Sequence, residues 1–325
     1  MNPSTAKPRA TRRLATGLVG AVLMVATACN PTVPPLVYAS DIGVADIGGG
    51  THVVAALAAD GSVTTTSVFC TSLGCALTPW SSLGGNLTSL QVDATSPGHV
   101  VVVGLAPGGA TWFRRGACTG TDCTWTEWTK LGGKLATLRS EQSATTQCVN
   151  LAGLTSTNQF NAYRASICED GTTGWASAHG AVLDLEVNSS GTLFGPRFHG
   201  HMFVRKVVGN QVSWPDIGGS TSDPATNPVD PTEQCGLSTG SRRLWCHSSS
   251  GWAAVGGTWA KLDDGTTIGV ADDGSVLDWR GGAIENSGGN MSEVAREGNL
   301  QVAITTGGVP QFRDFRNVSN TWQNL

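Results

Sequence analysis

Charged residues and long helical patterns are both scarce in this sequence. Only 14% of the 325 residues are Asp, Glu, Lys or Arg, and 43 are glycine, whereas about a quarter of an average soluble domain is charged. No stretch repeats apolar residues at helical spacing over several turns, which argues against a fold built on long helices. Short runs rich in Val, Thr and Trp, separated by Gly, Asp and Asn, predict strands and turns instead.

Basic residues are concentrated at the N-terminus. Lys7, Arg9, Arg12 and Arg13 precede the apolar stretch LATGLVGAVLMVATA, which is too short for an ordinary membrane span and is typical of a signal peptide. Removing residues 1–28 leaves 16 basic and 24 acidic side chains. This balance argues against nucleic acid as a partner, because phosphate binding needs a basic face, and against electrostatic docking on anionic lipid.

Cys29 directly follows the sequence Ala-Thr-Ala. Small residues before a cysteine resemble a bacterial lipobox, in which the cysteine is lipidated and becomes the first residue, although Ala26 departs from the usual Leu, Val or Ile. We expect a protein of the bacterial cell envelope, attached to a membrane only through lipid on Cys29; secretion after ordinary signal-peptidase cleavage is the alternative. Residues 29–40 predict a proline-rich, extended tether, and residues 41–325 the folded domain.

The other eight cysteines fall into four neighbouring pairs. These pairs are Cys70 and Cys75, Cys118 and Cys123, Cys148 and Cys168, and Cys235 and Cys246. In an exported protein we expect each pair to form a local disulfide. The first two pairs keep the same offsets from Trp80 and Trp128, so these two segments are copies of one unit. Zinc binding is the alternative for these two pairs, although no histidine lies at ligand spacing beside them.

A short motif, here called the repeat phrase, with a tryptophan three residues before an apolar residue and a glycine pair, recurs along the chain. PWSSLGG, EWTKLGG, SWPDIGG and GWAAVGG keep it, GWASAHG and AIENSGG are altered copies, and TWQNL ends the chain. The repeat tryptophans are Trp80, Trp128, Trp175, Trp214, Trp252 and Trp322. The aligned positions before the glycines are 83, 131, 178, 217, 255, 287 and 325, so each step spans 32 to 48 residues. Such periods are typical of propeller blades.

The second copy of the repeat shows the content of one unit. Its four runs are LTSLQVDAT, HVVVVGLA, ATWFRRGA and WTEWTKLG, with turn sequences between them. Seven such copies predict an all-β fold, a seven-bladed β-propeller with four-stranded antiparallel blades. Two disulfides would then join the second and third strands of a blade, and the two five-residue bridges would clip the third strand to the fourth. The Asp-Gly pairs are expected to form hairpin turns, with calcium loops as the alternative.

The W-x-x-L-G-G repeat resembles that of seven-bladed propeller lectins from bacteria and fungi, which bind fucose-type sugars between blades. The resemblance covers nearly all of the mature chain, but only through the repeat phrase, because the regular polar and aromatic set of that family is not kept in every blade. It implies carbohydrate binding at a few blade interfaces, without catalysis and without a cofactor.

Tryptophans inside and outside the repeat phrase suggest different roles. Those inside it, beside glycine pairs, are expected to pack between neighbouring blades. Sugar binding needs an exposed aromatic face with polar groups at its rim. The candidates outside the phrase are Trp112, Trp125, Trp245, Trp259, Trp279 and the adjoining Arg280. For each of these tryptophans, a buried structural role is the alternative.

Catalytic and metal-binding motifs are absent from the sequence. It contains no H-E-x-x-H, no G-x-S-x-G and no phosphate-binding loop, so no metal site is predicted. His199 and His201 would share one face of a strand as a satisfied surface pair, with weak metal binding as the alternative. The leading interpretation is a glycan-binding module. A scaffold for envelope proteins, with a broad apolar face, and a degenerate glycosidase or lyase, with carboxylates converging in a central channel, are the alternatives.

Overall fold

Short strands and a single 3-10 turn make up the part of the chain that the structure describes. This computed structural model describes residues 39–155, 160–227, 230, 233–263, 267–280, 282–315 and 321–325. The predicted signal peptide, Cys29 and nearly all of the tether lie outside these residues. Within them, no helix is long and apolar enough to cross a membrane.

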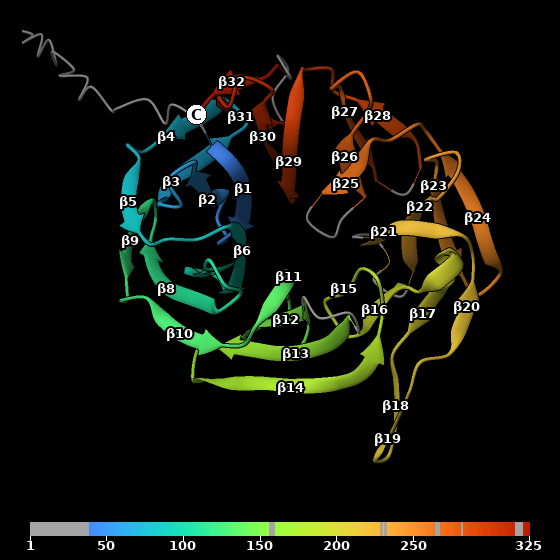
Figure 1. Ribbon diagram of the computed structural model, residues 1–325. Coiled ribbons are helices and arrows are strands. Elements are labelled where there is room, and N and C mark those ends of the chain that lie inside the picture. The colour runs from blue at the N-terminus through green and yellow to red at the C-terminus, as the bar shows by residue number, and fades with distance from the viewer. Residues whose placement is uncertain are drawn as a thin grey trace, which may run out of the picture. The chain divides into compact units, whose positions relative to one another are not determined.

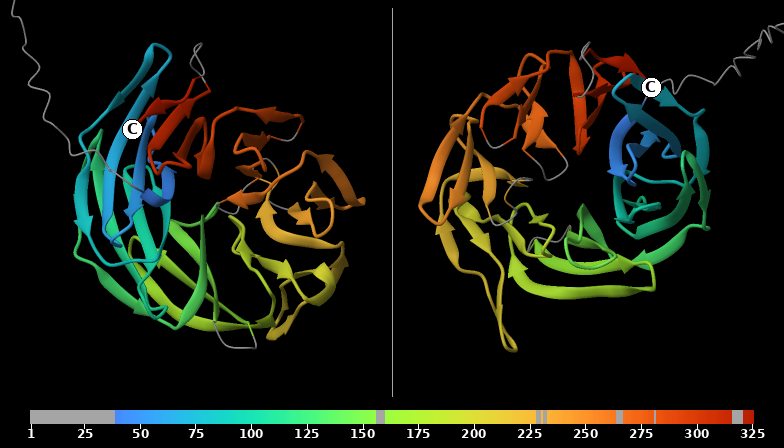
Figure 2. Two further views of the ribbon diagram at one scale, coloured as in Figure 1. Left: turned by 45° about the horizontal axis from the view of Figure 1, so that its top comes forward. Right: turned by 180° about the vertical axis from the view of Figure 1, so that it is seen from behind.

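Seven antiparallel sheets follow one another in chain order around a ring, as Figures 1 and 2 show. Each sheet is a meander whose first strand faces the centre and whose last strand lies at the rim (Figure 1). The predicted seven-bladed propeller with four-stranded blades is therefore confirmed.

In blades 1 and 2 the rim strand is divided into two pieces. Blade 1 comprises β1 (Ala39–Asp46), β2 (Thr51–Ala58), β3 (Val63–Thr71), β4 (Gly74–Leu77) and β5 (Ser81–Gly84). Blade 2 comprises β6 (Ser89–Ser96), β7 (His99–Leu105), β8 (Thr111–Thr119), β9 (Asp122–Trp125) and β10 (Thr129–Gly132). At each break a threonine hydroxyl replaces a backbone acceptor: Thr78 Oγ1 accepts from the N–H of Ser67 (2.8 Å), and Thr126 Oγ1 from that of Arg115 (3.1 Å).

Blades 3 and 4 differ in their rim strands. Blade 3 comprises β11 (Leu135–Gln142), β12 (Cys148–Thr155), β13 (Asn161–Cys168) and the continuous β14 (Gly171–Ala181). Blade 4 comprises β15 (Glu186–Val187), β16 (Leu193–Pro196), the 3-10 turn η1 (Phe198–Gly200), β17 (Met202–Val204) and β20 (Asp216–Gly218). Between its last two strands, blade 4 carries the hairpin of β18 (Lys206–Val208) and β19 (Gln211–Ser213), which projects away from the ring (Figure 1).

The last three blades have four strands each. Blade 5 comprises β21 (Thr221–Thr226), β22 (Gln234–Ser238), β23 (Leu244–Ser248) and β24 (Gly251–Gly256). Blade 6 comprises β25 (Lys261–Asp263), β26 (Ile268–Val270), β27 (Val276–Trp279) and β28 (Ile284–Asn286). Blade 7 comprises β29 (Met291–Glu297), β30 (Leu300–Thr305), β31 (Pro310–Asp314) and β32 (Gln323–Asn324).

The hydrophobic core is divided among the seams between neighbouring blades. Seven clusters of buried apolar side chains each join residues of neighbouring blades, one cluster to a seam. The strands alternate in the usual way, so the side chains of each blade face two different seams. Stability therefore depends on blade-to-blade packing as much as on the hydrogen bonds within each sheet.

The ring is closed by packing between blades 7 and 1. The first strand of blade 1 is N-terminal and the rim strand of blade 7 is C-terminal, so the described strands of each blade come from one continuous stretch of chain. The N–H of Ala39 donates to Gly308 O across this seam (3.0 Å). Ala39 and Leu325 both pack into the cluster of buried side chains that joins the two blades.

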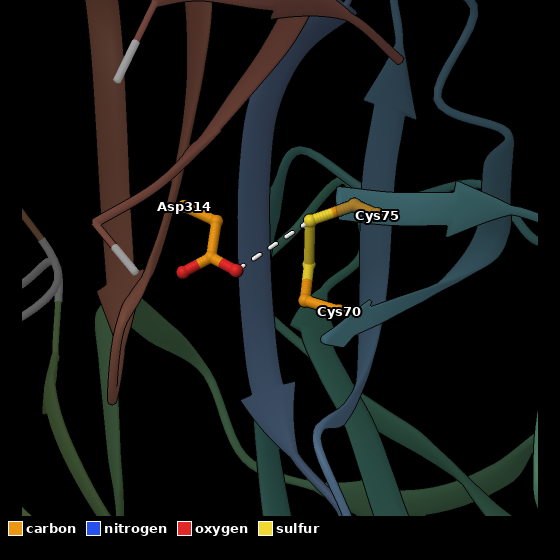
Figure 3. A group of neighbouring side chains, drawn as sticks. All are labelled: Cys70, Cys75 and Asp314. Carbon is orange, nitrogen blue, oxygen red and sulfur yellow. Dashed lines mark hydrogen bonds between the residues drawn. A yellow bond between two sulfur atoms is a disulfide. The ribbon is translucent and has the colours of Figure 1, made fainter. Parts of the chain in front are cut away.

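All four predicted disulfides are present. Cys148–Cys168 and Cys235–Cys246 join the second and third strands of blades 3 and 5, and Cys70–Cys75 and Cys118–Cys123 join the third strand to the fourth in blades 1 and 2. Asp314 of blade 7 lies 3.6 Å from Cys75 Sγ (Figure 3). This group is a poor metal site, because disulfide sulfurs are not thiolates.

Candidate functional site

The repeat tryptophans lie in the seams. The rings of five of them lie against the second residue of the glycine pair in the preceding blade, a pair that is His179–Gly180 in blade 3. A Cβ atom at Gly85 would lie 3.3 Å from the Trp128 ring, and one at Gly180 only 2.2 Å from the Trp214 ring. Four indole N–H groups donate to the carbonyl before that pair: Trp128 to Leu83 (2.9 Å), Trp214 to Ala178 (3.1 Å), Trp252 to Ile217 (2.8 Å) and Trp322 to Ser287 (3.1 Å). Trp80 and Trp175 pack in their seams through apolar contacts.

The seam between blades 5 and 6 uses a different tryptophan. Ile284 occupies the repeat position, and its smaller side chain leaves room that the ring of Trp259 fills. Trp259 is fully buried, and its indole N–H donates to Gly256 O (3.1 Å). Trp259 therefore presents no open face to a ligand in this structure.

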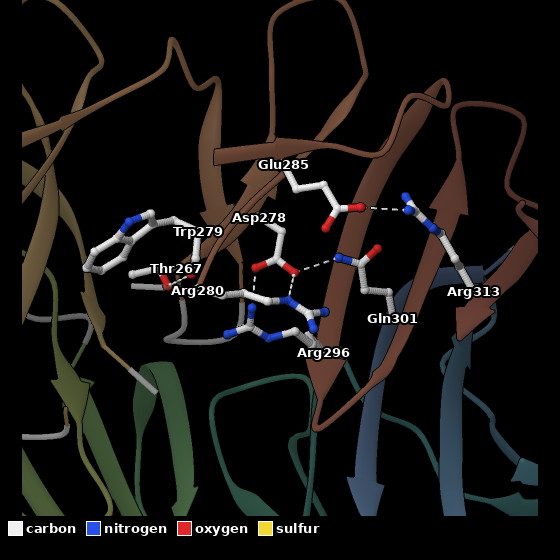
Figure 4. Close-up of polar contacts among 8 residues, drawn as sticks. All are labelled: Thr267, Asp278, Trp279, Arg280, Glu285, Arg296, Gln301 and Arg313. Carbon is white, nitrogen blue, oxygen red and sulfur yellow. Dashed lines mark hydrogen bonds and ion pairs between the residues drawn. The ribbon is translucent and has the colours of Figure 1, made fainter. Parts of the chain in front are cut away.

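Arg280 belongs to a group of polar contacts that joins blades 6 and 7, and Figure 4 shows it with its neighbour Trp279. The fully buried Asp278 carboxylate accepts from Arg280 Nε (2.8 Å), from Gln301 Nε2 (2.8 Å) and from Arg296 Nη1. The Arg280 guanidinium also lies over the Phe315 ring, 3.6 Å from its centroid. Trp279 is 9% exposed and packs into the seam between blades 5 and 6.

The remaining predicted tryptophans are half-buried, one on blade 5 and two on blade 2. Trp245 is on β23 of blade 5, and its indole nitrogen is buried without a partner in the described chain. Trp112 is on β8 of blade 2, with the Lys130 ammonium 5.9 Å from its ring centroid. Trp125 is on β9 of the same blade. The structure thus does not bring the six predicted ligand residues together into one site.

Trp125 lines a cavity of about 320 Å³ at the interface between blades 1 and 2. The other wall is blade 1, where the rim strand is broken beside the middle of β3, whose side chains are otherwise buried. Thr65, Thr66, Ser67, Thr78 and Ser81 of blade 1, and Thr121 and Asp122 of blade 2, supply its polar groups. The cavity therefore combines one aromatic ring with many hydroxyls and one exposed carboxylate.

The positions of these groups are set by neighbouring contacts. The Trp125 ring lies across Gly116 on the adjacent strand, where a Cβ atom would come within 2.9 Å of it. Thr78 is held by Thr66 Oγ1, which donates to its carbonyl (2.6 Å). The Asp122 carboxylate, and the hydroxyls of Thr65 and Ser67, make no hydrogen bond to any residue in the described part of the chain. These three groups are free to bind a ligand.

A comparison with the next seam explains why this cavity is open. Cys70 and Cys118 stand at equivalent positions of the repeat, so Ser67 is equivalent to Arg115. Between blades 2 and 3, Arg115 Nη2 donates to Cys168 O (2.9 Å) and Gly171 O (3.0 Å) and fills the equivalent space. The small Ser67 side chain leaves that space empty between blades 1 and 2. The substitution of Ser67 for Arg115 is visible in the sequence, but only when the two copies are aligned on their cysteines and not on the repeat phrase alone.

A second polar cavity, of about 410 Å³, lies at the central channel and is lined by residues of all seven blades. Its charged residues are Asp41, Arg139, Asp184, Asp223, Lys261 and Glu293. Burial, with repulsion from Glu293 added, raises the pKa of Asp41 to about 7. Burial also raises the pKa of Asp223, whereas Glu293 forms an ion pair with Lys261. Carboxylates therefore do converge in the channel.

Four more carboxylates on the first strands of blades 2, 3, 4 and 7 repel one another. Burial, with this repulsion added, raises the pKa of Glu186 to about 8 and that of Glu297 to about 7. Burial raises the pKa of Asp93 to about 6, and that of Glu141 well above its usual range. Arg139 Nε, 3.5 Å from the Glu186 carboxylate, offsets only part of this effect.

The predicted strand around the two histidines is wrong. His199 lies in the 3-10 turn η1 with a left-handed backbone (φ 69°), and His201 follows that turn. His201 Nδ1 lies 2.8 Å from the Asp216 carboxylate, so the two rings do not share one strand face. Gly200, with φ 76°, allows this tight turn where a strand would otherwise continue.

The chain matches no protein-family model and no curated protein, but solved structures share its fold. Acylaminoacyl peptidase from Pyrococcus horikoshii is 6% identical, with a TM-score of 0.55 over 88% of this chain and 52% of the peptidase. Uncharacterized protein lmo1340 from Listeria monocytogenes is 7% identical, with a TM-score of 0.51 over 90% of this chain and 95% of its own. AofleA from Arthrobotrys oligospora is 12% identical, with a TM-score of 0.49 over 88% and 85%. At such identities, likeness in structure shows the propeller fold alone.

Proposed function

We propose that this protein is an exported binding module that recognises a carbohydrate in the cavity between blades 1 and 2. The observation that carries the proposal is the Trp125 ring beside unpaired hydroxyls and the Asp122 carboxylate. Sugars present C–H groups on one face of the ring and hydroxyls at its edge. The Trp125 ring would stack on the C–H face, while Asp122, Thr65 and Ser67 would bind hydroxyls.

A glycan array with the purified protein, produced under oxidising conditions, tests the proposal. We expect saturable binding to a defined sugar. Trp125→Ala should abolish it, and Ser67→Arg should block it by filling the cavity as Arg115 fills the next one. Asp122→Asn should weaken binding, because Asp122 would bind sugar hydroxyls. Glu127→Gln is its matched control, because Glu127 is also exposed on blade 2 but does not line the cavity. Absence of binding, or equal binding by wild type and Ser67→Arg, would refute this site.

A hydrolytic activity in the central channel is a second candidate function. It is favoured by the carboxyl group of Asp41, whose pKa is raised to about 7, beside Glu293, which is ion-paired with Lys261. Paired carboxyl groups with different protonation states are the usual acid and base of glycosidases. Turnover of chromogenic glycosides that is lost in Asp41→Asn, but kept in Trp125→Ala, would support an enzyme. No turnover across the substrate panel would reject it.

A scaffold function would need a broad apolar face, and the exposed large apolar side chains are dispersed instead. On the described residues they occur on blade 1, at the junction of blades 3 and 4, on the hairpin β18–β19 and in the turn after β30. Envelope proteins remain the alternative partners. Co-purification that persists in Ser67→Arg and Trp125→Ala would point to them.

We also propose export with lipid on Cys29. Four disulfides are compatible with an oxidising compartment, and the tether would hold the propeller away from the membrane. Cys29→Ser should move the protein from the membrane fraction to the soluble fraction, and intact-mass analysis should show loss of the lipid. A wild-type protein that starts at another residue and carries no lipid would contradict this proposal.

A further inference from the structure

A cavity of about 610 Å³ lies where blade 3 meets blade 4, apart from both sites described above. Its walls are the end of β14, the segment leading to β15, and the turn η1 between β16 and β17. Phe160, Asn161, His179, Leu183, Arg197 and Phe198 are among the residues that line it. The volume lies in the range of 300 to 1,000 Å³ that is typical of small-molecule sites.

Large apolar side chains that are exposed to solvent line this cavity. Phe198 is 74% exposed, Leu183 41% and Phe160 38%. The three come from separate segments of the chain, so the fold rather than a local apolar run brings them together. Contiguous exposed apolar surface of this kind marks a binding site more often than isolated residues do.

The backbone around the cavity is held in unusual conformations. Phe160 (φ 41°), His179 (φ 55°) and His199 (φ 69°) are three of the five described non-glycine residues with positive φ. Such conformations are sparsely populated, and they occur preferentially at ligand sites. Phe160 and His179 line the cavity themselves, and His199 directly follows the lining residue Phe198 in η1.

The charge in the cavity is positive. The guanidinium of Arg197 lines it and no acidic residue in the described chain does, although acidic residues outnumber basic ones in the chain. The Arg197 guanidinium lies over the Phe203 ring, 4.1 Å from its centroid, and makes no hydrogen bond to any residue that the structure describes. The nearby Asp216 is already bonded to His201 (2.8 Å) and to the N–H of Gly218 (2.7 Å). Arg197 thus has donors available for an anion.

We propose that this cavity binds a small carboxylate with an apolar body, of the aryl or medium-chain alkyl class. The carboxylate would accept hydrogen bonds from Arg197, whose planar group suits a two-oxygen acceptor. The apolar body would cover Phe160, Leu183 and Phe198. Stacking on Phe203 already orients the Arg197 guanidinium, so this side chain loses little conformational entropy when the carboxylate binds.

The test uses decanoate and its neutral analogue 1-decanol, with binding to the purified protein measured by displacement of the fluorescent aromatic anion 8-anilinonaphthalene-1-sulfonate. We expect decanoate to displace the dye at concentrations at least tenfold lower than decanol. Arg197→Gln should weaken decanoate binding at least tenfold and leave decanol unchanged, whereas Phe198→Ser should weaken both. Arg243→Gln is the matched control, because Arg243 is exposed on blade 5 and outside the cavity.

The outcome separates this cavity from the proposed sugar site. Ser67→Arg should not change decanoate binding, because Ser67 lies between blades 1 and 2. Phe198 is largely exposed, so Phe198→Ser should keep the near-ultraviolet circular dichroism of the folded protein. Equal affinity for decanoate and decanol, unchanged binding in Arg197→Gln, or no binding by the wild type would each overturn the proposal.

Discussion

Removing the carboxylate of Asp278 tests whether buried polar groups hold blades 6 and 7 together. In Asp278→Ala, the Arg296 guanidinium, which is 5% exposed, and the fully buried Gln301 amide lose their acceptor. A buried cation left without its partner costs about 3–5 kcal/mol. We therefore expect the free energy of unfolding of Asp278→Ala to fall by about that amount relative to the wild type, measured by guanidinium denaturation at pH 7.

An exposed ion pair with the same nitrogen–oxygen distance supplies the control. Arg242 Nη1 and Asp272 Oδ1 lie 2.8 Å apart, as Arg280 Nε and Asp278 Oδ2 do, but the Arg242 and Asp272 side chains are 53% and 62% exposed. Such pairs contribute about 0–1 kcal/mol, so Asp272→Ala should change the unfolding free energy little. If the two alanine variants lose similar amounts of stability, burial is not the source of the effect and the reasoning fails.

Three further predictions concern the glycine pairs, the channel and the disulfides. Gly180→Ala should lower the stability by about 1–3 kcal/mol in thermal denaturation, because the new Cβ would lie 2.2 Å from the Trp214 ring; Gly174→Ala, with no atom within 4 Å, should not. Because the pKa of Glu186 is raised from 4.5 to about 8 in the folded protein, protonated Glu186 stabilises the fold at low pH, and this stabilisation is lost as the pH rises from about 4.5 to about 8. Wild-type stability should therefore fall across this window by up to ~1.4 kcal/mol per pH unit from this group, and the slope should be smaller in Glu186→Gln. Replacing both cysteines of the β12–β13 disulfide, 20 residues apart, with alanine should cost about 3 kcal/mol, roughly 1 kcal/mol more than the same change at the five-residue β3–β4 bridge; equal losses would contradict the loop-length argument.

The regular parts of the fold could be predicted because they repeat. A tryptophan, an apolar residue and a glycine pair recur at most seams, since these seams pose the same packing problem: a large ring must cover a close turn of the preceding blade. The local disulfides follow from the same repeat, because paired strands in a meander are neighbours in the sequence.

Features peculiar to one seam could not be predicted from the repeat. At the seam between blades 5 and 6, Ile284 stands where other blades have the repeat tryptophan, and Trp259 fills the space instead. This compensation between two positions is seen only in the packed seam. The cavity beside Trp125 depends on Ser67 standing where Arg115 stands in the next blade. The carboxylates of the channel come from separate blades, each only a single acidic residue in its own strand, so no local pattern marks them.

The closing seam between blades 7 and 1 has a consequence for the order of folding. Every other seam joins segments about one blade apart, whereas Ala39 must find Gly308 across nearly the whole propeller. Closing that longer loop costs about 1.5 kcal/mol more in chain entropy than closing a loop of one blade, so we expect this seam to form after the seams between consecutive blades. Folding should therefore pass through an open arc of blades, and its slowest conformational step should be the meeting of the two ends.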